Sequence, residues 1–129
     1  MKSTTIHTKG NWNAPWTNAL KKAIEDARNN TQVGENLLMQ TPDMKVWSIH
    51  LPVGQSLPFH KHNKPYFYVA LNNGTSRSYH HDGHITETDY KKDDTKHFEH
   101  LNDENYFIHN LENIGTTELN FITVEYLKK

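Results

Sequence analysis

The 129-residue sequence contains no cysteine. This absence excludes disulfide bonds, thiolate catalysis, iron–sulfur clusters and zinc sites built on cysteine. The first ten residues are polar and lack the apolar stretch of a signal peptide, and no later segment approaches the roughly 18 apolar residues of a transmembrane helix. We therefore expect a cytoplasmic protein with no membrane partner.

An excess of charge of one sign is also missing. The chain has 14 Lys and Arg against 15 Asp and Glu, which gives a net charge of −1. This balance provides no positive field to hold a phosphate backbone, so no nucleic-acid partner is expected. Apolar residues make up only 34% of the chain, but six Tyr, five Phe and three Trp add bulk to a core. We expect a single globular domain.

One segment near the N-terminus has the pattern of an amphipathic helix. The polar residues 1–12 predict a loose arm, and Asn13 is a residue type that caps helices. Apolar side chains then recur at helical spacing, at Leu20, Ala23, Ile24 and Ala27. The sequence therefore predicts an arm and one helix within residues 1–33, with the helix across about 15–28.

From residue 34 onward the apolar period changes to two. Short β-rich runs alternate with turn residues, at Leu37–Met39, Val46–Leu51, Leu57–His62, Tyr66–Leu71, Ser76–Tyr79, Ile85–Tyr90, Thr95–Phe98, Tyr106–Leu111 and Leu119–Tyr126. Asn73-Gly74 and Asp82-Gly83 predict type I′ hairpin turns, because both central positions of such turns need a positive φ. This pattern is typical of a β-sandwich or barrel, so residues 34–129 are predicted to form an all-β domain.

Histidine stands out in the composition, with ten copies. His60 and His62 lie two apart in a predicted strand, so their side chains share a face. His109 lies in a later aromatic strand. Imidazoles on an inward face need a partner for their lone pairs, and a divalent metal is such a partner. The three histidines therefore predict a metal site, with buried hydrogen-bonded histidines and no metal as the alternative.

Two segments resemble the motifs of the cupin superfamily, namely Gly54-x5-His60-x-His62 continuing to Gly74, and His109-x3-Asn113 with Gly115. The chain is similar to small single-domain cupins, and it resembles more weakly those labelled with β-alanine degradation. The resemblance implies a double-stranded β-helix, or jelly-roll, barrel. It also implies a divalent metal cofactor (Fe, Zn, Ni or Mn) and a homodimer.

The sequence departs from the cupin pattern at the acidic metal ligand. The glutamate of the family falls at Tyr66 or Phe67, and the spacing to Gly74 favours Phe67. If Phe67 faces the barrel, it makes the surroundings of the metal apolar; if the register slips by one residue, Tyr66 and Tyr68 line the barrel instead. The resemblance then implies a three-His site, as in cupin-like thiol dioxygenases and a diketone-cleaving dioxygenase.

An open three-His site predicts an enzyme that acts on a small polar metabolite. An oxygenase-type reaction is the leading interpretation, and Lewis-acid isomerase or lyase chemistry is the second. The alternative is a non-catalytic cupin that has lost the glutamate and binds or senses a small ligand. Tyr66, His97 and Glu99 are the candidate acid–base residues. The histidines at 80, 81 and 84 surround a predicted hairpin turn and are expected to lie on the surface.

Overall fold

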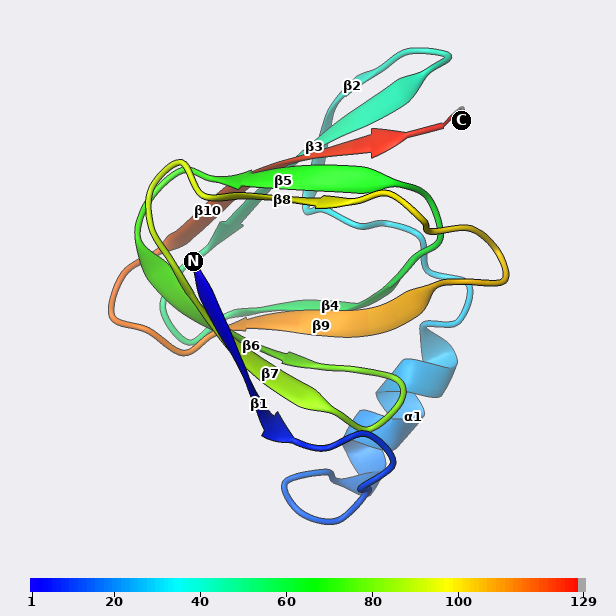
Figure 1. Ribbon diagram of the computed structural model, residues 1–129, viewed down its shortest axis with the longest axis vertical. Coiled ribbons are helices and arrows are strands. Elements are labelled where there is room, and N and C mark those ends of the chain that lie inside the picture. The colour runs from blue at the N-terminus through cyan, green and yellow to red at the C-terminus, as the bar shows by residue number, and fades with distance from the viewer. Residues whose placement is uncertain (128–129) are drawn as a thin grey trace.

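The computed structural model describes residues 1–127, in which it shows ten strands and one short helix (Figure 1). The elements are β1 (Lys2–His7), α1 (Asn18–Asp26), β2 (Asn36–Gln40), β3 (Met44–Leu51), β4 (Ser56–His62), β5 (Tyr66–Ala70), β6 (Gly74–Tyr79), β7 (Ile85–Tyr90), β8 (Thr95–Phe98), β9 (Phe107–Asn113) and β10 (Leu119–Tyr126). Strands β2–β10 fall on the nine predicted runs. The predicted all-β architecture with one helix is therefore confirmed.

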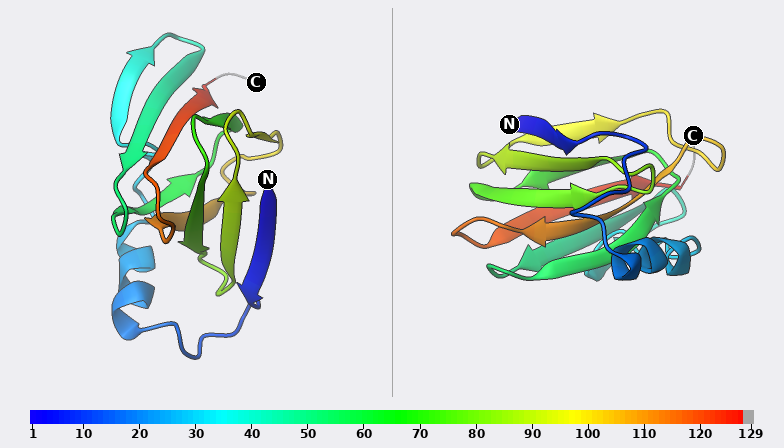
Figure 2. Two further views of the ribbon diagram at one scale, coloured as in Figure 1. Left: turned by 90° about the vertical axis from the view of Figure 1, so that its left-hand side faces the viewer. Right: turned by 90° about the horizontal axis from the view of Figure 1, so that it is seen from below.

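The strands form two antiparallel five-stranded sheets, in the orders β1-β7-β6-β9-β4 and β2-β3-β10-β5-β8. We call them the first and the second sheet. Most strands that follow one another in the sequence, such as β4 and β5, belong to different sheets, whereas β2–β3 and β6–β7 pair within one sheet. The chain therefore passes repeatedly between the two layers. Figure 2 shows the sheets facing each other with α1 outside them. This arrangement is the predicted jelly roll.

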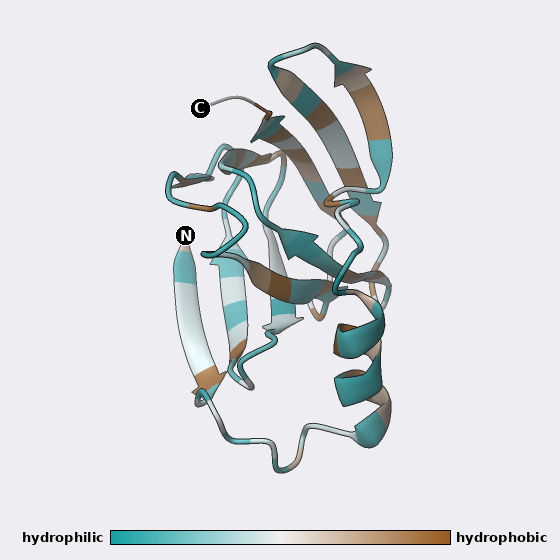
Figure 3. Ribbon diagram, turned by 90° about the vertical axis from the view of Figure 1, so that its right-hand side faces the viewer, coloured by the Kyte–Doolittle hydropathy of each residue, from teal (hydrophilic) through white to brown (hydrophobic). Residues whose placement is uncertain are grey.

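Two apolar clusters stabilise this arrangement. One lies between the sheets and comprises Ile49, Leu51, Leu57, Ala70, Tyr90, Leu111, Leu119 and Phe121. The other lies between the first sheet and α1 and comprises Trp16, Ile24, Ala27, Phe59, Tyr79, Ile85 and Ile108. The helix thus buries the face predicted from its spacing, and its outward face is hydrophilic (Figure 3).

The helix is shorter than the sequence predicts, and the predicted cap at Asn13 is wrong. Thr17 is the N-cap, and its side chain accepts a hydrogen bond from the Leu20 amide at 3.1 Å. The preceding Trp16 is buried, and its indole donates to the Gly83 carbonyl at 2.8 Å, so this residue anchors the loop before the helix begins. No helix within residues 1–127 is long and apolar enough to cross a membrane.

Two further expectations are wrong. Residues 2–7 are no loose arm, because they pair as edge strand β1 with β7. Asn73-Gly74 does not close a hairpin, because it joins β5 of the second sheet to β6 of the first, and Gly74 has no positive φ. The β6–β7 hairpin does form around Asp82-Gly83. Only Gly83 has a positive φ there, so the turn is not of type I′.

Candidate metal centre

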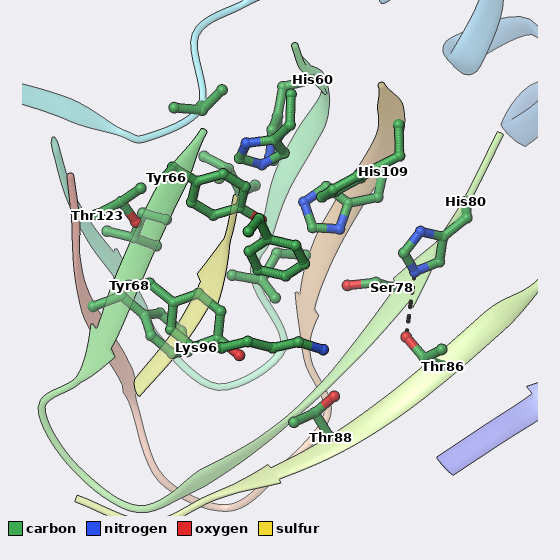
Figure 4. Close-up of a pocket in the computed structure, with 18 of the residues that line it drawn as sticks. His60, Tyr66, Tyr68, Ser78, His80, Thr86, Thr88, Lys96, His109 and Thr123 are labelled. Carbon is green, nitrogen blue, oxygen red and sulfur yellow. Dashed lines mark hydrogen bonds between the residues drawn. The ribbon is translucent and has the colours of Figure 1, made fainter. Parts of the chain in front are cut away.

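A cavity of about 340 Å³ lies between the two sheets (Figure 4). Hydroxyls and imidazoles of the first sheet and its β6–β7 hairpin line one side, and we call this side the polar wall: Ser3, Ser78, His80, His84, Thr86 and Thr88. Rings of the second sheet line the other side, the aromatic wall: Tyr66, Tyr68, Phe98 and Phe121. The volume suits a small molecule.

Three histidines meet at one end of this cavity. His60 and His62 project from β4, and His109 lies directly opposite His60 in the antiparallel pairing of β4 with β9. The ring of His60 lies 4.8 Å from that of His62 and 4.7 Å from that of His109, between centroids. One ligand nitrogen of each residue lies within 4.8 Å of the others. The structure therefore brings together the three predicted metal ligands.

A β-bulge in β4 aims these side chains. The pairing of β4 with β9 shifts between Leu57 and His60, and Pro58 in between has no N–H to donate to the ladder. Leu57 and Phe59 would share a face in a regular strand, but Leu57 lines the cavity while Phe59 packs in the cluster under α1. The bulge thus returns His60 and His62 to the side of Leu57, inside the barrel.

The histidines of this group are neutral bases. His60 and His62 are each only 2% exposed, and burial lowers the pKa of His60 to about 4 and that of His62 well below its ordinary value. Burial also lowers the pKa of His109 well below the ordinary value. Because the Pro58 carbonyl only accepts, Nδ1 of His60 donates to it at 2.8 Å. Nε2 of His60 therefore carries the lone pair.

The donor set fits a divalent metal. Nε2 of His60 lies 3.0 Å from Nε2 of His62, and Nδ1 of His62 is buried without a hydrogen-bond partner. In the metal-free protein, either one proton lies between these two Nε2 atoms, or their two lone pairs face and repel each other. Nitrogens bound to one metal at about 2.0–2.1 Å lie roughly 3.0–3.4 Å apart in adjacent positions. A cation between the rings would satisfy both Nε2 atoms.

Within residues 1–127, the ring of Tyr66, and no carboxylate, lies directly beside the group of three histidines. Tyr66 is buried and stacks on His62 with ring centroids 4.1 Å apart, and Phe98 stacks on its other side at 4.6 Å. Burial raises the pKa of the Tyr66 hydroxyl well above its ordinary value. Phe67 points away from the cavity, towards His97 and Tyr126. The inward placement of Phe67 is therefore wrong, and the alternative register holds.

Solved structures with the same architecture decide the fold. A cupin domain from Bordetella pertussis Tohama I matches with a TM-score of 0.62 and 18% identity, covering 79% of this chain and all of that one. A double-stranded β-helix cupin from Methanocaldococcus jannaschii matches with a TM-score of 0.57 and 20% identity, over 77% and 84% of the two chains. This chain has the cupin fold.

A third neighbour, a predicted oxalate decarboxylase from Thermotoga maritima, matches with a TM-score of 0.51 and 22% identity, over 77% of this chain and 88% of that one. No protein-family model matches the sequence. No curated protein matches it either. The comparisons therefore establish the cupin fold, while the activity has to be argued from the site.

Two candidate acid–base residues lie outside the cupin cavity. The side chains of His97 and Glu99 are 49% and 64% exposed, and they contact each other at 3.7 Å on the outer surface. His97 pairs with Phe67 across β8 and β5, and both rings face outward. Of the three candidates, only Tyr66 lines the cavity.

The expectation that the hairpin histidines lie on the surface is wrong for two of them. His80 and His84 line the cavity and stack on each other, with ring centroids 3.9 Å apart. His80 also lies 5.4 Å from the ring of His109. His81 points the other way and stacks on Tyr106. A period-two reading that continued the inward positions of β6 to residue 80 would have found His80.

Proposed function

We propose that this protein is a small metal-dependent cupin enzyme that holds one divalent metal through His60, His62 and His109 and acts on a small polar metabolite. The observation that carries the proposal is the convergence of three neutral imidazoles, two buried and one half-buried, at the end of a cavity. An oxygenase-type reaction is the leading subclass. When bound, the metal would supply Lewis-acid polarisation of a substrate oxygen, and a redox-active metal would also supply electrons.

The chain supplies a proton acceptor beside this site. The Asp82 carboxylate accepts hydrogen bonds from Nδ1 of His84 and, at 3.1 Å, from its backbone amide. Because Nδ1 carries the proton, Nε2 is the nitrogen of neutral His84 that can accept one. His80 stacks on this ring and contacts the Thr86 hydroxyl at 3.3 Å. His84 thus takes the acid–base role in place of the exposed His97 and Glu99.

A non-catalytic ligand-binding cupin is the second candidate function. It is favoured by Tyr66, whose ring stacks on His62 where the family places an acidic ligand. In that case the cavity binds its ligand through ring contacts and hydroxyls, and removal of metal leaves affinity unchanged.

Metal analysis tests the proposal. Untagged protein is incubated with Fe(II), Zn(II), Mn(II) or Ni(II), freed of excess metal, and analysed by elemental mass spectrometry. We expect about one equivalent of metal in the wild type and loss of that metal in His109→Gln. His100→Gln is the matched control, because the His100 side chain is 89% exposed and outside the cavity.

A wild-type chain that stays empty with all four metals would refute the metalloenzyme proposal. Retention of metal by His109→Gln would instead place the metal elsewhere. Oxygen uptake by the Fe(II)-loaded protein in the presence of small metabolites would support the enzyme over the non-catalytic binding protein. In a binding protein, removal of the metal would leave ligand affinity unchanged.

A further inference from the structure

Residues 1–127 line the cavity with positive and neutral groups but with no acidic ones. This lining comprises five histidines, one lysine, hydroxyls, aromatic rings and aliphatic side chains, and no Asp or Glu side chain. Carboxylates of the surrounding elements are already engaged, including buried Glu125, which accepts from the Trp47 indole at 3.4 Å. Asp82 accepts from His84, and Asp94 pairs with the amino group of Met1 at 3.0 Å and accepts from the Lys91 amide at 2.8 Å. A negative charge inside the cavity must therefore come from a ligand.

Lys96 brings the one cationic side chain of the described lining to this cavity. It belongs to β8 at the mouth, and its Nζ lies 5.1 Å from the ring centroid of Phe98. Figure 4 shows the side chain extending past Tyr68 towards the polar wall. Lys96 and His80 both line the cavity, so the ammonium group and the polar wall border the same space.

Within residues 1–127, the charge of Lys96 is not paired with an opposite charge. Its described contact is with the face of Phe98, and no ion pair joins it to a carboxylate among residues 1–127. An ammonium group held over a ring at the mouth of an acid-free cavity is a ready binding partner for an anionic group. The rings beside it offer flat apolar surface for the body of the same ligand.

We propose that the cavity selects a small carboxylate with a flat apolar body, with Lys96 as the residue that recognises its charge. The body lies against Tyr68 and Phe98, and hydroxyls of the polar wall, such as Ser78, donate to the carboxylate oxygens. One point cation suits a singly charged head group better than a phosphate dianion, which is commonly bound by a forked arginine. That such a ligand also reaches the metal rests on the proposed function. Recognition of its carboxylate by Lys96 does not need the metal.

Binding of two matched probes tests this inference. Benzoate and benzamide have the same flat body, but only benzoate carries charge. Ligand-observed NMR titrations with each probe are run on metal-free protein in the presence of a chelator, and then on metal-loaded protein. We expect benzoate to bind metal-free wild type about tenfold more tightly than benzamide, which is the effect of one charged hydrogen bond. Added salt should reduce the preference.

Variants assign the preference to one residue. Lys96→Met should lower benzoate affinity about tenfold and leave benzamide affinity unchanged, because the apolar part of the side chain is kept. Lys96→Arg should restore the preference for benzoate. Lys92→Met is the matched control, because Lys92 is an exposed lysine outside the cavity lining, and it should bind both probes as the wild type does.

Three results would overturn the inference: equal affinity of wild type for the two probes, an unchanged benzoate preference in Lys96→Met, or no benzoate binding at millimolar concentration to either form. A chain that binds no metal but still prefers benzoate through Lys96 would refute the metal-dependent function and leave the carboxylate selection standing. The two failures are therefore distinguishable.

Discussion

Mild acid should destabilise the metal-free protein, because its cavity holds histidines that stay neutral when folded. Burial lowers the pKa of His60 to about 4 and that of His80 to about 3. In the unfolded chain both groups have the ordinary histidine pKa of about 6.5. At a pH between the folded and the unfolded pKa, each histidine is protonated in the unfolded chain but stays neutral in the folded protein. The stability from these groups is therefore fully present above about pH 6.5 and is lost as the pH falls.

The size of the effect follows from these pKa values. At about pH 5, the unfolded form of each histidine gains roughly 2 kcal/mol from protonation, while the folded form gains almost nothing. His60 and His80 together lower the free energy of unfolding by about 4 kcal/mol between pH 7.5 and pH 5. His62 and His109, whose pKa values burial also lowers, act in the same direction. The total free energy of unfolding of a typical domain is about 5–15 kcal/mol, so this loss is a large part of it.

Urea unfolding followed by tryptophan fluorescence measures this loss at the two pH values in the presence of a chelator. His80→Gln should reduce the change in unfolding free energy between the two pH values by about 2 kcal/mol, because glutamine has no proton to gain in the unfolded chain. His100→Gln, at a side chain that is 89% exposed, is the control. Glu125 opposes the effect, because burial raises its pKa, and the comparison between wild type and His80→Gln cancels this contribution.

Equal unfolding free energies at the two pH values, to within about 1 kcal/mol, would refute the argument. So would a His80→Gln variant whose pH dependence matches that of wild type and His100→Gln. Either result would mean that the cavity histidines accept protons while the protein stays folded, and that they are less desolvated than the structure shows.

Three further predictions concern the framework around the cavity, each measured by urea unfolding. Glu125→Gln should stabilise the protein at neutral pH, because burial raises the pKa of this carboxyl and the amide oxygen can still accept from the Trp47 indole; a loss of stability would contradict this. Leu119→Ala removes a side chain that is 1% exposed and should cost about 2–5 kcal/mol. Gly83→Ala should cost about 1–3 kcal/mol, since φ is +94° and the new Cβ would lie 3.1 Å from the Gly10 amide nitrogen; a neutral effect would contradict it.

Local sequence patterns were sufficient to predict strands β2–β10 and part of the candidate site. Period-two alternation placed nine strands, because each buries one face between two layers. The same rule put His60 and His62 on one face. Strand β1 was missed because its sequence is polar, and its pairing with β7 rests on backbone hydrogen bonds that carry no side-chain pattern.

The choice between Tyr66 and Phe67 needed the strand register. A shift of one residue exchanges the two faces of a strand, and spacing to a distant glycine does not fix it. Pairing of Tyr66 with Phe98 and Glu125 in the neighbouring strands sets the inward face. The β4 bulge at Pro58 is a similar case, because it changes which residues point inward without changing the apolar pattern.

The sequence by itself determined the fold class, the β-strand content and the three histidines that meet in the cavity. Only the tertiary structure decided that His80 and His84 join them and that His97 faces outward. It also decided that the lining, as far as residues 1–127 form it, holds Lys96 but no acidic side chain. The physical reason is the range of the interactions. Alternation within a strand is local, whereas the walls of a cavity are set by pairing and curvature of strands that lie far apart in the chain.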